Sequence, residues 1–239
     1  MRAAEPPPLV KICGVMEAQH ARAAASLGAD FIGMVFAPSR RQVTMGQAAK
    51  IAKALGKRNE RAPTGATTAQ QVEALLAQRR PLLVGVFADQ DAETINGIAD
   101  ECSLDLVQLS GSEPWEMCRS LNRPVLKCLK VMQEHNADEL LASVQDVAIP
   151  LLDPYVSGTY GGTGQTLDWE VAAAVAQQVR LVLAGGLTPG NVAQAVAQVH
   201  PWAVDVSSGV ETDGAKDVDK MRAFIQAAKQ VRPPEAMLE

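Results

Sequence analysis

Residues 181–211, LVLAGGLTPGNVAQAVAQVHPWAVDVSSGVE, are the stretch that decides the fold. Two short apolar runs, 181–184 and 202–206, each end in a turn of small residues. Apolar runs bounded in this way are typical of buried strands. Between them, valines and alanines recur at helical spacing in a segment that we expect Pro189 to open. The stretch is therefore predicted to be a βαβ unit with parallel strands and a right-handed crossover.

The two turns of this unit, Gly185-Gly186 and Ser207-Ser208-Gly209, are candidates for an anion site. Small residues let backbone N–H groups approach an anion closely. In a β/α barrel, a phosphate commonly binds at the loops after the last two strands. One glycine pair by itself more often only ends a strand. Two such turns in consecutive units favour a phosphate site.

The rest of the chain repeats the same alternation of apolar runs and amphipathic segments. We predict further strands at 8–12, 31–36, 82–87, 106–109, 125–129 and 149–152. We predict further helices at 16–27, 45–55, 92–100, 113–121, 137–147, 169–178 and 217–231. About eight βα units in 239 residues indicate an α/β protein, a (β/α)8 TIM barrel that forms a single domain over 1–239. An open doubly wound sheet is the alternative, but the first strand lacks the GxGxxG fingerprint.

Two segments do not fit the alternation. Residues 1–7 form a Pro-rich lead-in, and residues 56–80 lie between the second helix and the third strand. Within 56–80, a charged and Pro/Gly-containing part precedes an amphipathic segment with Val72, Leu75 and Leu76 on one face. We interpret 56–80 as a surface insertion and expect a solvated elaboration without a role in chemistry.

Composition limits the partners and the compartment. The net charge of -5 and the pI near 5.3 disfavour nucleic acid and an anionic membrane as partners. An anionic small molecule stays compatible, since a local group of N–H donors can oppose the global charge. No apolar run reaches the roughly 18 residues of a membrane span, and the N-terminus has no secretory h-region. The four cysteines show no CxxC pair and no metal spacing, so we expect reduced thiols, a cytoplasmic protein and no metal site.

Chemistry in such a barrel takes place at the C-terminal ends of the strands. The polar residues expected there are Cys13, Arg41, Asp89, Ser110, Asp153, Asp205, Ser207 and Ser208. Cys13 and Asp153 each follow a buried strand, and we expect strands one and six to lie across the mouth from one another. A thiol and a carboxyl group facing one substrate suit general acid–base catalysis. The plainer alternatives are a buried small hydrophobe for Cys13 and a cap or loop residue for Asp153.

Two more strand-end residues are candidates for substrate binding. Arg41 offers a bidentate guanidinium fork to a carboxylate, although a surface arginine is equally compatible with the sequence. Asp205, between Val204 and Val206, would cost free energy if buried without a partner. We expect its carboxylate to bond a substrate group or neighbouring backbone.

These residues belong to ordered segments that resemble the phosphoribosylanthranilate isomerase family of tryptophan biosynthesis. The segments include VKICG (10–14), SRRQV (39–43), LLD (151–153), GGTGQTLDW (161–169), LAGGLTPGNV (183–192) and VDVSSGVE (204–211). The resemblance runs over nearly the whole chain. The insertion and the last helix look more like the fungal branch, in which this domain often ends a multifunctional tryptophan-pathway polypeptide.

The resemblance implies an Amadori rearrangement of N-(5'-phosphoribosyl)anthranilate without a cofactor. It implies that Cys13 is the general base and Asp153 the general acid. Arg41 would bind the anthranilate carboxylate, and Asp205 would lie near the anthranilate amine. This mechanism requires a site that favours the thiolate form of Cys13 and raises the pKa of Asp153 above the ordinary value of an aspartate. The residues that the resemblance places around the phosphate are Gly162, Gly164, Gly185, Gly186, Ser207, Ser208 and Gly209.

One departure keeps alternatives open. Where the family usually has QLHG, this chain has Gln108-Leu109-Ser110-Gly111, and serine does not titrate near neutrality. A catalytically altered or non-catalytic barrel, retained within a multienzyme, is therefore the alternative from another class. Other phosphate-binding barrel enzymes are less compatible. A histidine-pathway sugar isomerase would have an aspartate in place of Cys13, and the lysine and glutamate set of indoleglycerol-phosphate synthase is not recognisable.

Overall fold

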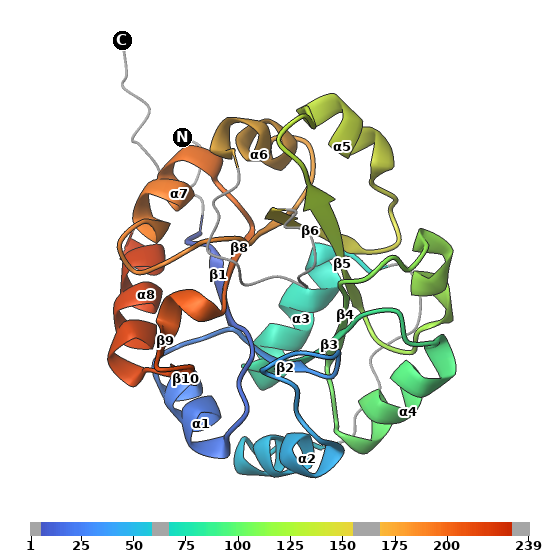
Figure 1. Cartoon of the computed structure of the whole chain (residues 1–239), viewed down its shortest axis with the longest axis vertical. Helices are drawn as coiled ribbons and strands as arrows, with labels where there is room; N and C mark the ends of the chain where they lie inside the picture. Colours follow the sequence, from blue (N-terminus) through green and yellow to red (C-terminus); the bar gives the residue numbers. More distant parts are fainter. Residues whose placement is uncertain (1–5, 59–66, 155–167, 231–239) are drawn as a thin grey trace.

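The computed structural model describes residues 6–58, 67–154 and 168–230. Eight parallel strands pair in sequence order and close into a barrel, with β1 beside β8 (Figure 1). The strands are β1 (Leu9–Ile12), β2 (Phe31–Val35), β3 (Leu82–Phe87), β4 (Leu106–Leu109), β5 (Val125–Val131), β6 (Ile149–Pro154), β7 (Val182–Leu183) and β8 (Ala203–Val206). The predicted (β/α)8 barrel is confirmed.

Helices surround this barrel on its outside (Figure 1). They are α1 (Ala18–Ser26), α2 (Met45–Ala54), α4 (Ala92–Glu101), α5 (Ala137–Ser143), α6 (Trp169–Ala176), α7 (Val192–Val199) and α8 (Val218–Gln230). Local capping determines several of their starts. At α2, for example, the Thr44 side chain accepts a hydrogen bond from the Gln47 N–H, and Gln47 bonds back to the Thr44 N–H, which forms a capping box.

Several predicted helices differ from the structure, and the helix predicted over 137–147 already ends at Ser143 as α5. The connection after β4 is the short 3-10 helix η1 (Trp115–Ser120) rather than an α-helix over 113–121. Helix α7 begins at Val192 rather than at Pro189. The side chain of Asn191 explains the later start, because its Oδ1 accepts from the Thr188 N–H at 2.7 Å and its Nδ2 donates to the Gly186 carbonyl at 3.0 Å. These bonds hold the preceding residues in a turn.

The two-residue period of the strands separates two apolar layers. Residues such as Val10 and Ile12 point outward and pack in the larger cluster with the helices. The alternate residues, such as Leu126 and Leu151, fill the barrel interior. Lys11 and Cys13 also point inward, because they are alternate residues at the C-terminal end of β1. The barrel interior is therefore polar at this end and apolar at the other.

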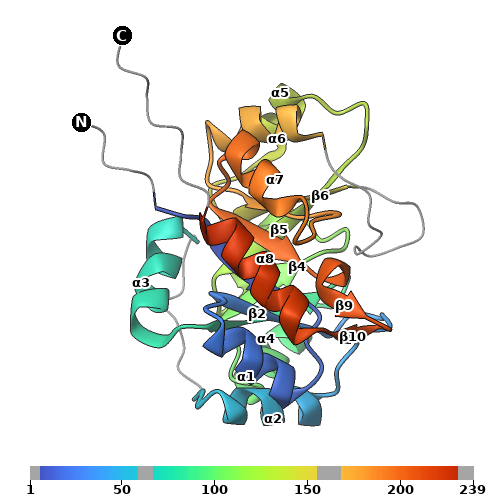
Figure 2. The same cartoon turned by 90° about the vertical axis from the view of Figure 1, so that its left-hand side faces the viewer.

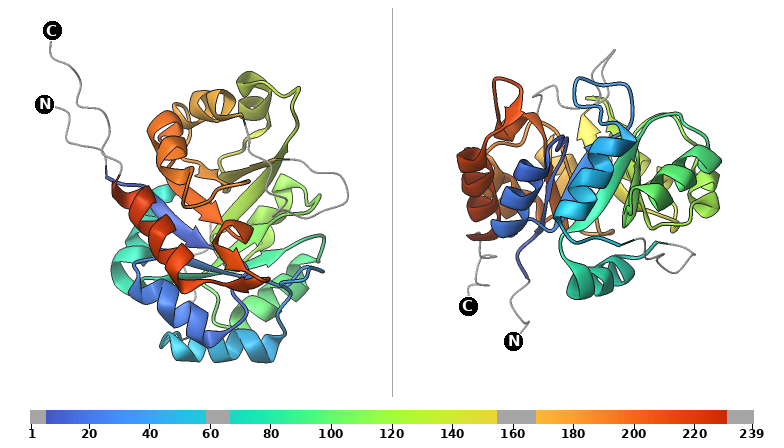
Figure 3. Two further views of the ribbon diagram at one scale, coloured as in Figure 1. Left: turned by 60° about the vertical axis from the view of Figure 1, so that its left-hand side comes forward. Right: turned by 90° about the horizontal axis from the view of Figure 1, so that it is seen from below.

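The helix α3 (Ala69–Arg79) lies at the N-terminal end of the barrel, opposite the hairpin of β9 (Glu211–Thr212) and β10 (Ala215–Lys216) (Figures 2 and 3). Its predicted apolar face of Val72, Leu75 and Leu76 is buried in the same cluster as the interior strand residues. The expectation that 56–80 is a solvated elaboration is therefore wrong for this face, which covers the barrel end. Residues 59–66 lie outside the described residues.

Candidate active site

One cavity opens at the C-terminal ends of the strands and gathers most of the candidate residues. Its lining includes Cys13, Arg41, Ser110, Asp153, Asp205, Gly185, Gly186, Ser207, Ser208 and Gly209. Asp89 is not among the lining residues, since its carboxylate accepts from the Ser112 N–H at 2.7 Å in the neighbouring loop. Gly162 and Gly164 lie outside the described residues.

A buried ion pair lies beneath Cys13. Lys11 on β1 and Asp205 on β8 are partners in the strand register, and Lys11 Nζ lies 3.0 Å from Asp205 Oδ1. The prediction that Asp205 bonds a substrate group or neighbouring backbone is therefore wrong for its Oδ1 atom, which pairs with Lys11. Burial by itself lowers the pKa of Lys11, but Asp205 and Cys13 outweigh it and raise that pKa above its ordinary value. Lys11 is therefore a permanent cation beside the thiol.

The Cys13 thiol occupies a space that a side chain on β2 would close. A Cβ on Gly33 would lie 2.9 Å from Cys13 Sγ and 3.2 Å from Lys11 Nζ, so only glycine leaves room for both groups. Burial and the nearby Asp205 raise the pKa of Cys13, while Lys11 acts in the opposite sense. The resting state is thus the thiol, whereas the sequence analysis expected a site that favours the thiolate. The reason is that burial and the Asp205 carboxylate together outweigh the ammonium groups of Lys11 and Lys216.

Asp153 has its own cationic partner. Lys130 on β5 and Asp153 on β6 are register partners, and Lys130 Nζ lies 3.1 Å from Asp153 Oδ2. Burial raises the pKa of Asp153 and Lys130 opposes this, with a net increase. A raised pKa is what a proton donor needs, as expected from the sequence. The expected position across the mouth is wrong, because β7 and β8 alone separate β6 from β1 and the strand opposite β1 is β5.

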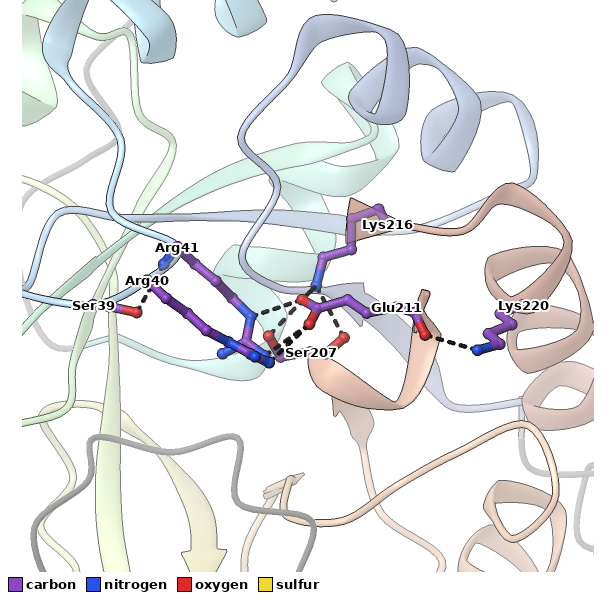
Figure 4. A network of polar contacts seen from close by, with 7 residues as sticks. All are labelled: Ser39, Arg40, Arg41, Ser207, Glu211, Lys216 and Lys220. Atoms are coloured by element: carbon purple, nitrogen blue, oxygen red, sulfur yellow. Dashed lines mark hydrogen bonds and ion pairs between the residues drawn. The ribbon is translucent and has the colours of Figure 1, made fainter. Parts of the chain in front are cut away.

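Arg41 faces the cavity but already holds an internal carboxylate (Figure 4). Its Nε lies 2.7 Å from Glu211 Oε1 and its Nη2 lies 2.9 Å from Glu211 Oε2. The bidentate fork predicted for a substrate carboxylate is thus used within the protein. The other edge of the guanidinium includes Nη1, for which the described residues provide no hydrogen-bond acceptor. Arg41 can therefore still bind an anion end-on.

The turns after β7 and β8 pack against each other at the same cavity. Gly185 and Gly186 have φ values of +88° and +61°, which strain any residue with a Cβ. A Cβ on Gly209 would lie 1.9 Å from the Leu187 carbonyl oxygen, so the two turns approach too closely for a side chain there. Small residues on both turns leave backbone groups facing the cavity, which is the arrangement the sequence predicted for a phosphate.

Ser110 follows β4, at the position where the family resemblance implies a histidine. It is buried at the cavity, and its Oγ accepts from Gln108 Nε2 at 3.0 Å. The Gln108 Oε1 atom is also buried and has no hydrogen-bond partner among the described residues. Ser110 and Gln108 thus line one part of the cavity with polar groups that do not titrate.

Sequence reasoning missed four charged residues of this site. Lys11 lies two positions before Cys13 and Lys130 two positions after Cys128, so the strand period places both on the inner face. A lysine in a strand that points into a barrel needs a carboxylate, and this signal was available. Glu211 and Lys216 meet through the β9–β10 pairing, for which two residues per strand give no sequence signal.

The fold and the site together define a class. The chain is a (β/α)8 barrel enzyme whose carboxyl, thiol and guanidinium groups converge at the C-terminal mouth. Among the described residues, no helix has the length and apolar character that crossing a membrane requires.

Comparison with known proteins identifies the family. The family model for N-(5'-phosphoribosyl)anthranilate (PRA) isomerase matches residues 52–227. The chain is 45% identical to an N-(5'-phosphoribosyl)anthranilate isomerase of Roseiflexus castenholzii, over 92% of this chain and 98% of that protein. It therefore belongs to the N-(5'-phosphoribosyl)anthranilate isomerase family.

Two further relatives show how this domain occurs elsewhere. The chain is 42% identical to a multifunctional tryptophan biosynthesis protein of Schizosaccharomyces pombe, over 94% of this chain and 30% of that protein. This confirms the fungal resemblance. A solved phosphoribosyl anthranilate isomerase in complex with reduced 1-(o-carboxyphenylamino)-1-deoxyribulose 5-phosphate superposes with a TM-score of 0.71 at 33% identity, covering 93% of this chain and 98% of that one.

Proposed function

We propose that the chain catalyses the Amadori rearrangement of N-(5'-phosphoribosyl)anthranilate to 1-(2-carboxyphenylamino)-1-deoxyribulose 5-phosphate in tryptophan biosynthesis. The observation that carries the proposal is the convergence of Cys13 and Asp153 on one cavity with Arg41 and the turns after β7 and β8. Family membership supports the same reaction. A retained but non-catalytic barrel is not favoured, because the thiol and the carboxyl group are both in place.

In the first step, the carboxyl group of Asp153 protonates the furanose ring oxygen, and the ring opens to a Schiff base. The raised pKa of Asp153 supports this role, because the acid form persists to higher pH than for an exposed aspartate. Once the proton has left, the Lys130 ammonium 3.1 Å away stabilises the carboxylate. Lys130 thus lowers the pKa of Asp153 before the proton transfer and stabilises the carboxylate that the transfer leaves.

In the second step, Cys13 as thiolate removes the C2' proton and gives an enolamine, which tautomerises to the ketone. The resting thiol must first lose its own proton, and the neighbouring Lys11 ammonium favours the resulting thiolate. Because burial and Asp205 raise the pKa of Cys13, activity should increase with pH as the thiol ionises. The two steps shift protons without any net redox change, so the reaction as proposed needs no cofactor.

Binding would use the remaining groups of the cavity. Arg41 would bind the anthranilate carboxylate end-on, and Asp205 would lie near the anthranilate amine. The small residues Gly185, Gly186, Ser207, Ser208 and Gly209, together with Gly162 and Gly164, would surround the phosphate. We further propose a cytoplasmic location, alone or within a multifunctional tryptophan-pathway polypeptide. The four free buried cysteines support a reducing compartment.

A coupled fluorescence assay tests the proposal. Phosphoribosylanthranilate is generated in situ from anthranilate and phosphoribosyl pyrophosphate, and the loss of its fluorescence is followed. Turnover by the wild type is the expected result. A folded wild type without turnover would refute the isomerase function and favour an altered barrel marked by Ser110.

A further inference from the structure

We infer that Glu211 is a positioning residue, and that the β9–β10 hairpin sets the distance between the anchor for the substrate carboxylate and the anchor for its phosphate. The inference rests on the proposed function, because it takes Arg41 and the Ser207 turn as these two anchors. It adds residues that bind no reacting atom and act through their neighbours.

Glu211 holds the guanidinium of Arg41 by two contacts. Glu211 is buried in its side chain, with 6% exposed, and takes both Nε and Nη2 of the guanidinium. A two-point contact fixes the plane of the guanidinium as well as its position. Gly14 crowds the same side chain from below, since a Cβ there would lie 2.5 Å from Arg41 Cδ. The free edge of Arg41 consequently has one orientation in the cavity.

Lys216 links Glu211 to the turn after β8. Lys216 is the register partner of Glu211 in the hairpin, and its Nζ lies 2.7 Å from Glu211 Oε1 (Figure 4). The same Nζ donates to the Ser207 carbonyl at 2.9 Å. Lys216 is almost completely buried, so these bonds are shielded from water. One chain of contacts therefore runs from Arg41 through Glu211 and Lys216 to Ser207.

The negative charge of Glu211 does not depend on pH in the working range. Burial would raise the pKa of Glu211, but hydrogen bonds from Arg41 and Lys216 outweigh it and lower the pKa to about 2. A group with a depressed pKa keeps its stabilising charge above its unfolded value and loses it only as the pH falls toward 2. Glu211 is therefore a fixed charge in this chain of contacts. Burial lowers the pKa of its partner Lys216, and the hydrogen bond to Glu211 opposes that shift.

The charge balance allows a discriminating experiment. Arg41 and Lys216 both contact the single Glu211 carboxylate, so the buried cluster is cationic and attracts an anionic substrate. Removing the negative charge by Glu211→Gln would, by Coulomb attraction alone, strengthen the binding of that substrate. A loss of Arg41 orientation would weaken it. The two explanations predict opposite signs.

The test measures KM, kcat and the affinity of two inhibitors for wild type and Glu211→Gln. The inhibitors are reduced 1-(o-carboxyphenylamino)-1-deoxyribulose 5-phosphate and the same compound without its ring carboxylate. We expect about 10- to 100-fold weaker binding of the carboxylated inhibitor, a similar rise in KM, and little change in kcat. The inhibitor without the carboxylate should bind within about threefold of wild type. Lys216→Met, which acts on the phosphate turn, should weaken both inhibitors alike.

Arg40→Gln is the matched control, because Arg40 contacts the same carboxylate at 3.0 Å with 63% of its side chain exposed. Exposed pairs contribute little, so its constants should stay close to wild type. Tighter binding by Glu211→Gln, or equal losses for both inhibitors, would overturn the inference. Absence of turnover in the wild type would instead refute the proposed function, so the two failures are distinguishable.

Discussion

The two ends of the barrel use the same chemical groups differently. At the N-terminal end, Asp30 accepts from the Val10 N–H at 2.7 Å and pairs with Arg80 at 2.8 Å and Lys229 at 3.0 Å. Asp105 accepts from the Leu83 N–H at 2.8 Å and pairs with Lys57 and Arg79, each at 3.1 Å.

At the C-terminal end, by contrast, the two buried carboxylates that line the open cavity have fewer partners. Asp153 has Lys130 and Asp205 has Lys11, and both line the site. The pKa of Asp153 is raised, so its proton is available. The comparison indicates that carboxylates with two cationic partners stabilise the barrel, whereas those with one cationic partner at the cavity are left to react.

The largest effect is expected at the reactive end. Cys13→Ala and Asp153→Asn should each reduce kcat by about 10²- to 10⁴-fold, because each removes one proton-transfer group. Thermal stability should change little. The coupled fluorescence assay and a thermal melt measure both quantities. Cys118→Ala, a buried cysteine away from the cavity, is the control. Turnover retained by Cys13→Ala would contradict its role as base.

At the N-terminal end, where Asp30 and Asp105 each have two cationic partners, a substitution should reduce stability and leave kcat unchanged. Asp105→Ala should lower the free energy of unfolding by about 3–5 kcal/mol, because it removes the buried carboxylate that pairs with Lys57 and Arg79 and accepts from the Leu83 N–H. The kcat of the folded fraction should not change. Urea unfolding and the turnover of the folded enzyme measure the two effects. A large loss of kcat without a loss of stability would break the proposed division between the two ends.

A smaller loss is expected from the helix that covers the N-terminal end. Leu76→Ala should destabilise by about 2–4 kcal/mol, since it removes a buried side chain between α3 and the barrel interior. Gln78→Ala, on the exposed face of the same helix, should stay within about 0.5 kcal/mol of wild type. Equal urea midpoints for the two variants would show that α3 does not contribute to the core.

The smallest effect is a change in pH dependence. Lys130 lowers the pKa of Asp153, so Lys130→Met should raise that pKa further and extend the acid form to higher pH. The limb of kcat against pH on which Asp153 titrates should then move to higher pH, while kcat at the optimum falls only several-fold. Lys130→Arg retains the cation and should leave the limb in place. An unchanged limb in Lys130→Met would mean that Asp153 is not the acid whose titration limits the rate.

The strand and helix positions could be read from sequence because they depend on short-range periodicity. The six-residue run Leu82–Phe87 is apolar throughout and was predicted with its observed bounds, since a strand buried on both faces has no polar positions. The start of α7 could not be predicted, because it depends on the bonds of Asn191 to Thr188 and Gly186 rather than on Pro189. For α3, the apolar face was visible in the sequence, but what it covers was not.

The sequence by itself determined the barrel, the strand ends and hence the residue types at the mouth, because the side-chain period and the glycine turns are local properties. Only the tertiary structure decided which charges meet. Barrel closure brings Lys11 beside Asp205 across 194 positions of chain, and the β9–β10 hairpin places Glu211 on Arg41 across 170. The Lys11–Asp205 pair acts on the pKa of Cys13. The contact of Glu211 with Arg41 determines which edge of the Arg41 guanidinium is free. No local pattern encodes these pairings, because they arise from the register of strands that are distant in sequence.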